Sequence, residues 1–171
     1  MCRKKGQIDF EQKEGKEMKK VIVVRGIAGC GKSTYVEGLI EGVEPGENVR
    51  VCSADYFFMD KGEYKFDPTK IAHAHNFCMW KFLNALAWKN GLVIVDNTFV
   101  HKWEYENYIC AAKLVGWEVE VHEFRVGTVA QIRECHRRCR HGVPLDVIAR
   151  MAVEFEHDET ALWTFKIKGV E

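Results

Sequence analysis

A glycine-rich stretch near the start of the chain has the residue types and spacing of a phosphate-binding loop. Residues 26–33, GIAGCGKS, contain three glycines, and Gly26 and Gly31, with four residues between them, are followed by a lysine and a hydroxyl side chain. Bare backbone amides can point at phosphate oxygens, and a helix beginning here adds its positive end. Lys32 would reach the β- and γ-phosphates, and the Ser33 hydroxyl would contact Mg²⁺. We therefore predict that a nucleoside triphosphate, ATP in the simplest case, binds with Mg²⁺ at Gly26, Gly29, Cys30, Gly31, Lys32, Ser33 and Thr34.

Two aspartates follow short apolar runs further along the chain. Asp55 lies in SADYFF and is a candidate base for an acceptor hydroxyl; alternatively, it is a solvated carboxylate that caps a loop or helix. Asp96 lies in LVIVDNT, where a carboxylate can hold Mg²⁺ directly or through a water. The alternative for LVIVDNT is a turn in which Asp96 or Asn97 caps the next helix. Both roles can coexist at Asp96.

Arginines are concentrated in the segment IRECHRRCRHGVP, residues 132–144. They fit a helical lid that closes over the nucleotide and neutralises the charge of the phosphoryl-transfer transition state. They also fit a plain solvated face at the end of a helix. We expect the lid, with Arg137 and Arg138 on the nucleotide and Arg138 supported by the helix stripe that Arg133 and Arg137 share, although the sequence leaves open which arginines face inward.

The same segment contains a superficial zinc pattern. Cys135 and Cys139 lie one helical turn apart, with two histidines nearby. A structural zinc site needs four converging ligands, and His136 points away from the cysteine face. We expect no metal site at these cysteines.

Short apolar runs alternate with helical patterns from residue 21 onward, and this order predicts a doubly covered parallel sheet. In such a sheet ligands bind beyond the carboxyl ends of the strands, which is where the glycine-rich loop and both aspartates fall. The fold class expected is therefore α/β, a P-loop NTPase fold with an arginine-rich helical lid. The expected strands are 21–24, 49–52, 92–95 and 119–121, and the expected helices are 32–40, 69–89, 103–115, 128–140 and 145–156.

Composition fits one intracellular domain. With 171 residues, 47% of them hydrophobic, the chain can bury one ordinary core, expected over residues 21–171 behind a charged, flexible arm at residues 1–20. Lys+Arg and Asp+Glu both number 25, so no overall field attracts nucleic acid or membrane, and an anion site must be local. No apolar run is long enough to span a bilayer, and the N-terminus lacks the apolar core of a secretory signal. The seven cysteines, an odd number, fit a reducing compartment. We expect a cytoplasmic protein with no membrane partner.

Aromatic side chains flank the candidate base. Tyr56, Phe57, Tyr64 and Phe66 could stack on a substrate ring or form a hydrophobic plug beneath the loop. Both interpretations stay open at this point.

The order of the motifs resembles that of the polynucleotide-kinase-like P-loop proteins of phages, bacteria and eukaryotes. The resemblance extends over roughly residues 20–157 and includes SADYFF followed by GEYKFDP, then AHAHNFCMWKFLNAL, LVIVDNT and RRCRHGVPLDVIARMAVEFE. It implies a kinase that moves the γ-phosphate of a nucleoside triphosphate to a 5′-hydroxyl end of DNA or RNA. By the same resemblance, Lys32 and Ser33 match the phosphate and Mg²⁺ contacts, Asp55 the general base, Asp96 the second active-site carboxylate, and Arg138 the lid arginine before HGVP.

The sequence departs from this family pattern at two places. Cys139 stands where many relatives have asparagine, and the basic residue that holds a 3′-phosphate in several phage kinases is replaced by apolar residues 57–59, with Lys61 as a possible substitute. A kinase for a small-molecule hydroxyl, such as that of a nucleoside, sugar nucleotide or antibiotic, is therefore an alternative. A non-catalytic, nucleotide-dependent binding module is another.

Overall fold

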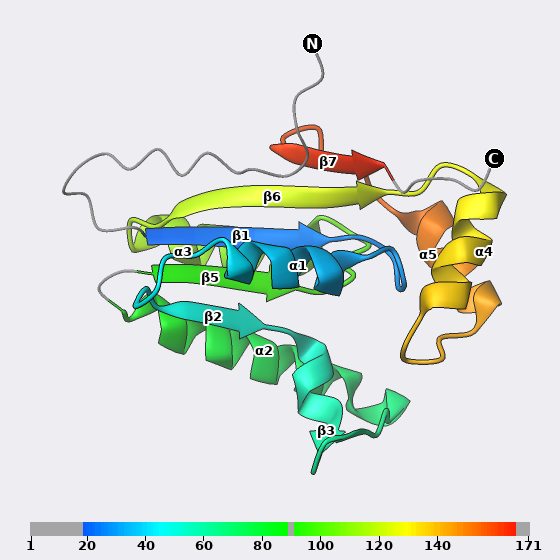
Figure 1. Cartoon of the computed structure of the whole chain (residues 1–171), viewed down its shortest axis with the longest axis horizontal. Coiled ribbons are helices and arrows are strands. Elements are labelled where there is room, and N and C mark those ends of the chain that lie inside the picture. Colours follow the sequence, from blue (N-terminus) through cyan, green and yellow to red (C-terminus); the bar gives the residue numbers. More distant parts are fainter. Residues whose placement is uncertain (1–18, 89–90, 167–171) are drawn as a thin grey trace.

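The protein folds around a five-stranded parallel sheet, whose strands lie side by side in Figure 1. The computed structural model describes residues 19–88 and 91–166. The strand order is β2-β5-β1-β6-β7, and every pair of neighbours is parallel. The predicted parallel α/β fold is confirmed. The strands are β1 (Lys19–Arg25), β2 (Val49–Cys52), β5 (Gly91–Asp96), β6 (Glu118–Arg125) and β7 (Trp163–Lys166).

The central strands are buried on both faces because their side chains are branched and apolar throughout. Residues 21–24 of β1 and 92–95 of β5 have no solvent exposure. Their alternate side chains enter two different cores. Val21 and Val23 pack with the helices of one face, whereas Ile22 and Val24 pack with those of the other. The glycine-rich loop therefore follows a strand that is buried on both faces.

Helices cover both faces of the sheet and one end of it (Figure 1). One core contains residues of α2 and α3, and the opposite core contains residues of α1, α4 and α5. Figure 1 shows α4 and α5 beyond the carboxyl ends of the strands. The helices are α1 (Lys32–Glu41), α2 (Ile71–Leu86), α3 (Trp103–Leu114), α4 (Val129–Arg138) and α5 (Leu145–Glu154).

Several elements were absent from the sequence-based expectation. The strand β7 extends the sheet beside β6. Between β2 and α2 the chain forms two 3₁₀ turns and a small hairpin, namely η1 (Ala54–Phe58), β3 (Met59–Asp60), β4 (Glu63–Tyr64) and η2 (Pro68–Lys70). The strand β1 begins at Lys19, so the last two residues of the expected arm belong to the sheet. Residues 1–18 of that arm lie outside the described residues.

A buried ion pair secures the end of β1, directly before the glycine-rich loop. Arg25 has no solvent exposure, and its Nη1 donates to Glu123 Oε2 on β6 at 3.0 Å. Its other nitrogens donate to the carbonyl oxygens of Phe99 and Val100, and Nη1 also contacts the Tyr105 hydroxyl. These contacts tie β1 to β6 and to the segment after β5, so that the strand ends that carry the candidate site are held together.

Within the described part of the chain, no helix has both the length and the apolar character needed to cross a membrane.

Candidate active site

The glycine-rich loop joins β1 to α1 and wraps around the Lys32 amine. The Nζ atom donates to the carbonyl oxygens of Gly26 at 2.8 Å and Ile27 at 3.0 Å. Burial lowers the pKa of the Lys32 amine, but the neighbouring Cys30 sulfur and Asp96 carboxylate raise it by more. Lys32 is therefore a cation held inside the loop, where a phosphate oxygen could replace the carbonyl contacts.

Two glycines of the loop are required by its geometry. Gly29 has φ +74°, and a Cβ atom there would lie 1.9 Å from the carbonyl oxygen of Cys135 on α4. Gly31 precedes α1 with φ +104°, in the left-handed region that side chains disfavour. The loop thus packs directly against the backbone of the predicted lid helix.

Ser33 and Asp96 meet at the carboxyl end of the sheet, as predicted for a Mg²⁺ site. Ser33 Oγ, in the first turn of α1, lies 3.4 Å from Asp96 Oδ2 at the end of β5. Burial raises the pKa of Asp96, whereas Lys32 lowers it and Asp55 raises it further. A hydroxyl and a desolvated carboxylate are hard oxygen ligands, and a divalent cation would relieve the cost of burying the charge. The side chains present therefore fit Mg²⁺. Thr34 follows in the same turn and is exposed.

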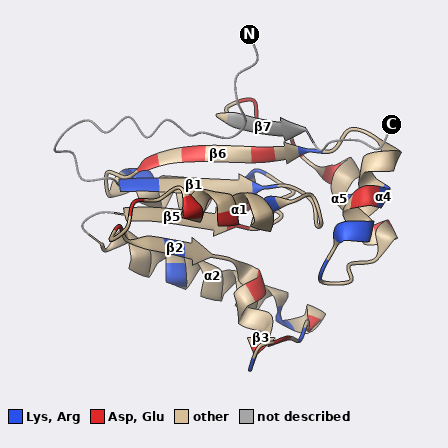
Figure 2. Cartoon of the chain, viewed as in Figure 1, with Lys and Arg blue, Asp and Glu red and all other residues tan. Residues whose placement is uncertain are grey.

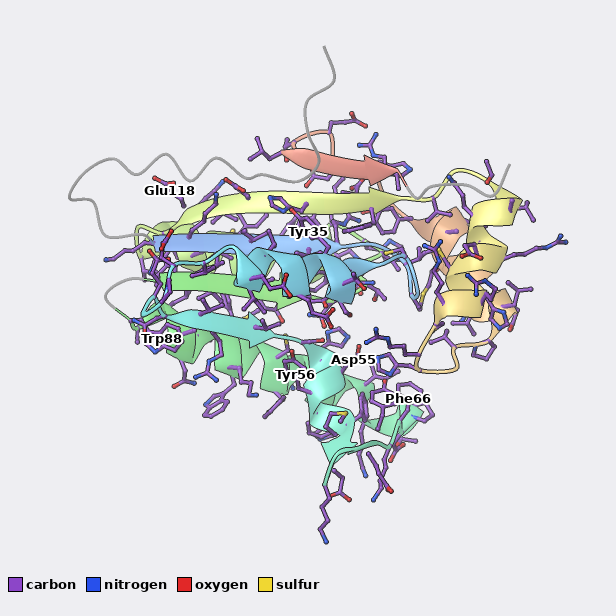
Figure 3. All side chains as sticks on the ribbon, in the orientation of Figure 1. Tyr35, Asp55, Tyr56, Phe66, Trp88 and Glu118 are labelled. Atoms are coloured by element: carbon purple, nitrogen blue, oxygen red, sulfur yellow. The ribbon has the colours of Figure 1, made fainter. Side chains whose placement is uncertain are left out.

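Asp55 lies in η1, directly after β2, and is contacted from two other elements. Its backbone amide donates to Ser53 Oγ at 3.3 Å, and Ser53 thereby caps the start of the 3₁₀ turn. The Tyr64 hydroxyl of β4 donates to Asp55 Oδ1 at 3.1 Å, and burial together with Asp55 raises the pKa of Tyr64, so that it remains a donor. His141 Nε2, in the α4–α5 loop, lies 3.7 Å from Asp55 Oδ2. The Asp55 carboxylate is exposed to solvent (Figure 3), and the contacts with Tyr64 and His141 hold its orientation.

Neither contact of Asp55 was anticipated from the sequence. Tyr64 was considered as a stacking ring or a hydrophobic plug, and His141 as one of the histidines near the two cysteines of the lid segment. Their positions in GEYKFDP and RHGVP were the available signals, but the pairing with Asp55 depends on long-range folding.

Asn97 ties η1 to the end of β5. The buried Asn97 side chain accepts the amide hydrogen of Ala54 at 2.8 Å and donates to Cys78 Sγ at 3.4 Å. The alternative in which Asn97 caps the next helix is wrong, because α3 begins six residues later and its N-terminal residue Lys102 makes no side-chain cap. Asn97 instead fixes the spacing between the strand ends that carry Asp55 and Asp96.

The two expected lid arginines share one carboxylate. Arg137 donates to Glu134 through Nε at 2.8 Å and Nη2 at 2.6 Å, and Arg138 Nε donates to Glu134 Oε1. These bonds, led by the one from Arg137, lower the pKa of Glu134 to about 2, so it is ionised at neutral pH. Arg133 and Arg140 are exposed on the same helix and just after it. Glu134 was missed, although its (i, i+3) and (i, i+4) spacing to the two arginines was a readable signal.

The cysteines of the lid segment are separated in the structure. Cys135 is buried in the core beneath the glycine-rich loop, and Cys139 is half-buried after α4. Across residues 19–88 and 91–166, no three His, Cys, Asp or Glu side chains are grouped as metal ligands.

The aromatic side chains around Asp55 form a connected cluster. The Tyr64 ring lies 4.0 Å from the His141 ring and is stacked with Phe66, with centroids 6.4 Å apart. Phe58 is buried against Phe66, which is itself largely exposed. Phe58 thus forms a hydrophobic plug beneath the loop, whereas stacking of the exposed rings on a substrate stays a prediction. Lys61 lies exposed in the β3–β4 turn with φ +50°.

Comparison with protein families gives a match that spans most of the chain. The model of a family described as AAA domain matches residues 21–157. This span contains the glycine-rich loop, both aspartates and the arginine-rich helix.

Individual relatives include proteins of different kinds. NEDD4-binding protein 2 of Homo sapiens is 29% identical over 136 residues, which are 80% of this chain but 8% of the human protein. A chain of the Pnkp1/Rnl/Hen1 RNA repair complex is similar in structure, with a TM-score of 0.62 and 15% identity over 84% of this chain and 46% of that one. The APS kinase CysC of Mycobacterium tuberculosis, in complex with AMPPNP and APS, has a TM-score of 0.58 and 14% identity over 91% of this chain and 92% of that one. At these identities the structural matches establish a shared P-loop kinase-like fold.

Proposed function

The chain belongs to the AAA domain family, and from this premise we propose that it is a kinase that transfers the γ-phosphate of ATP to the 5′-hydroxyl end of a DNA or RNA strand. One observation carries the proposal. Ser33, in the first turn after the glycine-rich loop, lies 3.4 Å from Asp96 at the end of β5, and the Asn97 side chain accepts from the backbone of Ala54 in η1, next to Asp55. Phosphate cradle, metal ligand and candidate base thus lie on elements that these contacts join, which supports a site for phosphoryl transfer.

The loop and its neighbours supply the triphosphate half of the site. On nucleotide binding, the Lys32 amine would exchange the carbonyls of Gly26 and Ile27 for phosphate oxygens. Ser33 and Asp96 would hold Mg²⁺, which supplies positive charge to the β- and γ-phosphate oxygens when bound. The structural relative crystallised with AMPPNP and APS supports a nucleotide in this fold.

Asp55 supplies the acceptor half. Tyr64 donates to Oδ1 and leaves Oδ2 to face an incoming hydroxyl, with His141 at its side. As the acceptor oxygen bonds to the γ-phosphorus and the bond from that phosphorus to the β–γ bridging oxygen breaks, the hydroxyl proton passes to the Asp55 carboxylate. ADP leaves with the bridging oxygen.

For this reaction the Arg138 guanidinium must leave the Glu134 carboxylate and contact a phosphate oxygen. Arg138 now lies on Glu134, on a helix whose backbone contacts the loop at Gly29. We propose that phosphate draws Arg138 from Glu134, while Arg137 keeps the carboxylate paired. A guanidinium at the γ-phosphate stabilises the charge that grows in the transition state.

A kinase for a small-molecule hydroxyl is the second candidate. The observation in its favour is the APS kinase match, which extends over 92% of that enzyme's chain, whereas the match in the RNA repair complex extends over 46%. The residues that bind the triphosphate would be the same for either acceptor. The two candidate functions require different surfaces beyond Asp55, where the acceptor binds.

Transfer from γ-labelled ATP to a panel of acceptors tests the proposal. The panel contains a 5′-hydroxyl oligonucleotide, the same oligonucleotide with a 5′-phosphate, nucleosides, adenosine phosphosulfate and water. We expect label on the 5′-hydroxyl oligonucleotide and none in the Lys32→Ala protein. Preferential labelling of a small molecule would select the second candidate, and nucleotide binding without any transfer would identify a non-catalytic binding module.

A further inference from the structure

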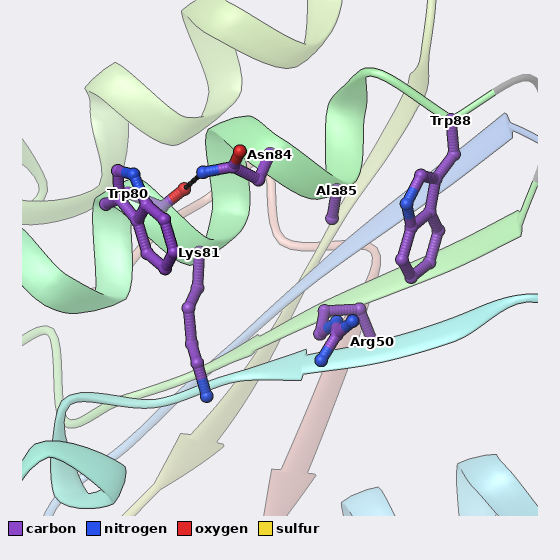
Figure 4. Close-up of a pocket in the computed structure, with 6 residues that line it drawn as sticks. All are labelled: Arg50, Trp80, Lys81, Asn84, Ala85 and Trp88. Atoms are coloured by element: carbon purple, nitrogen blue, oxygen red, sulfur yellow. Dashed lines mark hydrogen bonds between the residues drawn. The ribbon is translucent and has the colours of Figure 1, made fainter.

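A groove with aromatic and cationic walls runs between the outer face of α2 and the edge strand β2. Its volume is about 330 Å³. In Figure 4 the two tryptophans lie at opposite ends of the groove, and between them Lys81 extends from α2 toward β2, the strand that carries Arg50. The lining residues are Arg50, Trp80, Lys81, Asn84, Ala85 and Trp88.

The charge of this groove is of one sign. Arg50 and Lys81 line it, and neither β2 nor α2 contains an aspartate or glutamate. Figure 2 shows the same absence of acidic colour on the two elements, in contrast to α4 and β6. On a chain with no net charge, an acid-free patch of this kind is a local attraction for anions.

The two tryptophans of the groove differ in exposure, because Trp80 is exposed to solvent whereas Trp88 is half-buried and packs partly against the core. Trp80 is 61% exposed, and its ring is stacked on that of Phe77 at 6.4 Å with an interplanar angle of 23°. At the other end, the Arg50 guanidinium lies 5.3 Å from the Trp88 ring centroid. Asn84 donates to the Trp80 carbonyl at 2.7 Å, between the two tryptophans. Flat rings beside cations, with an amide group between them, are the elements that bind unpaired bases and their phosphates.

The groove is continuous with the acceptor half of the site. Tyr56 follows Asp55 in the chain, and the Lys81 amine lies 5.5 Å from the Tyr56 ring and 4.8 Å from the Phe77 ring. Figure 3 shows Tyr56 beside Asp55 and Trp88 at the far end of the same side of the sheet. Along α2, the nine steps from Phe77 to Leu86 measure roughly 14 Å, and Trp88 follows two residues beyond the end of the helix. That length exceeds one nucleotide.

We propose that this surface, the α2 track (Arg50, Tyr56, Phe77, Trp80, Lys81 and Trp88), binds the single-stranded part of the acceptor that follows its 5′-terminal nucleotide. The proposal rests on the proposed function and adds the direction of the strand, away from Asp55 along α2. Bases stack on the exposed rings, and phosphates lie against Lys81 and Arg50. A duplex would hide its base faces from Trp80, so the track selects unpaired strands.

Binding to a fluorescent 5′-hydroxyl oligonucleotide of about 12 nucleotides tests the track separately from catalysis. Fluorescence anisotropy is measured on the full chain with a non-hydrolysable ATP analogue. We expect Trp80→Ala to weaken binding by about 10-fold or more, because one stacked base contributes on the order of 5- to 100-fold. The matched control is Trp103→Ala, which removes a ring that is 67% exposed and stacked on His101, at the start of α3. It should leave the dissociation constant unchanged.

Salt dependence separates phosphate binding from simple hydrophobic contact. Each phosphate contact in a single strand contributes about 0.7 to the slope of the logarithm of affinity against the logarithm of salt concentration. Arg50→Gln and Lys81→Gln should each reduce that slope by about 0.7. An unchanged slope in both variants would overturn the placement of the strand.

Acceptor length distinguishes failure of the track from failure of the proposed function. The preference in kcat/KM for the oligonucleotide over a dinucleotide should fall in Trp80→Ala and persist in Trp103→Ala. Three results would each overturn the track. They are equal effects of Trp80→Ala and Trp103→Ala on oligonucleotide binding, displacement of the oligonucleotide by a polyglutamate peptide as effectively as by unlabelled oligonucleotide, and absence of oligonucleotide binding. Track-dependent binding without phosphate transfer to any 5′-hydroxyl would support the track and refute the kinase.

Discussion

From the buried ion pair between Arg25 and Glu123 we predict how much a substitution of Glu123 lowers the free energy of unfolding. Glu123 Oε2 accepts from Arg25 Nη1 and from the amide of Asp158, and Oε1 accepts from Arg125 and contacts His157 Nδ1. In Glu123→Gln, one acceptor oxygen becomes an NH₂ group. Whichever way the amide turns, the NH₂ group opposes a guanidinium that was donating to the carboxylate.

The side-chain exposures indicate how large the loss should be. The amide should turn its NH₂ group toward Arg125 and His157, since both are partly exposed and water can replace the lost contact. Arg25 is fully buried and then lacks a counter-charge. Removing one partner of a buried pair costs about 3–5 kcal/mol. Because the amide oxygen still accepts from Arg25, we expect the low end, about 3 kcal/mol, or a fall in Tm of roughly 6–12 °C.

Urea unfolding at pH 7, followed by tryptophan fluorescence, measures this loss. A matched control is the same carboxyl-to-amide change at the exposed pair of Asp60 and Lys65, which lie 2.8 Å apart with more than half of each side chain exposed. Asp60→Asn should cost no more than about 0.5 kcal/mol. Equal shifts for the two substitutions would refute the reasoning from burial. Replacing Arg25 and Glu123 together by Met and Leu should recover part of the stability, because it removes the unpaired guanidinium but leaves the Asp158 amide without its Glu123 acceptor.

Three further predictions concern the loop, the lid and the sheet. Gly29→Ala should abolish nucleotide binding measured by calorimetry, because its Cβ would strike α4, whereas Gly38→Ala, in open space on α1, should stabilise the protein by roughly 0.5–1 kcal/mol in thermal unfolding. Arg138→Ala should lower kcat at saturating ATP by on the order of 10²-fold, with partial recovery in Arg138→Lys and a smaller effect in Arg133→Ala; a reversed order would move the lid role to Arg133. Burial lowers the pKa of His122, so the unfolded chain binds a proton there more readily than the folded one, and stability present above about pH 6.5 should be lost as the pH falls. His122→Gln should flatten the pH dependence of Tm below about pH 6.5. An unchanged profile would refute the attribution of this pH dependence to His122.

The fold could be predicted where burial on both faces forces an unambiguous pattern. The runs VIVV and LVIV contain only branched apolar residues, and they form the two central strands. The strand β7 is four residues long and, within the described part of the chain, pairs with β6 alone, so its formation depends on a partner far away in the sequence. Arg25 shows the same limit. Its burial could not be read from the sequence, because its partners, which include Glu123 and the carbonyl of Phe99, lie 98 and 74 residues away.

The residues of the candidate site could be predicted where they are neighbours in the sequence. The loop from Gly26 to Ser33 is a single stretch, and its backbone geometry follows from its glycines. The orientation of Asp55 depends instead on Tyr64 from the hairpin and His141 from beyond α4, which no local pattern joins. The position of the lid arginines depends on Glu134, because a nearby carboxylate competes with phosphate for the same guanidinium.

The most direct measurement is the single-turnover rate of label transfer from ATP to a 5′-hydroxyl oligonucleotide, in the unaltered protein and in Asp55→Asn. If Asp55 is the base, the substitution should slow transfer by about 10²- to 10⁴-fold while ATP affinity is retained. The same oligonucleotide carrying a 5′-phosphate should acquire no label from either protein. Absence of transfer to the 5′-hydroxyl in the unaltered protein would contradict the polynucleotide kinase, and an undiminished rate in Asp55→Asn would contradict the role of Asp55.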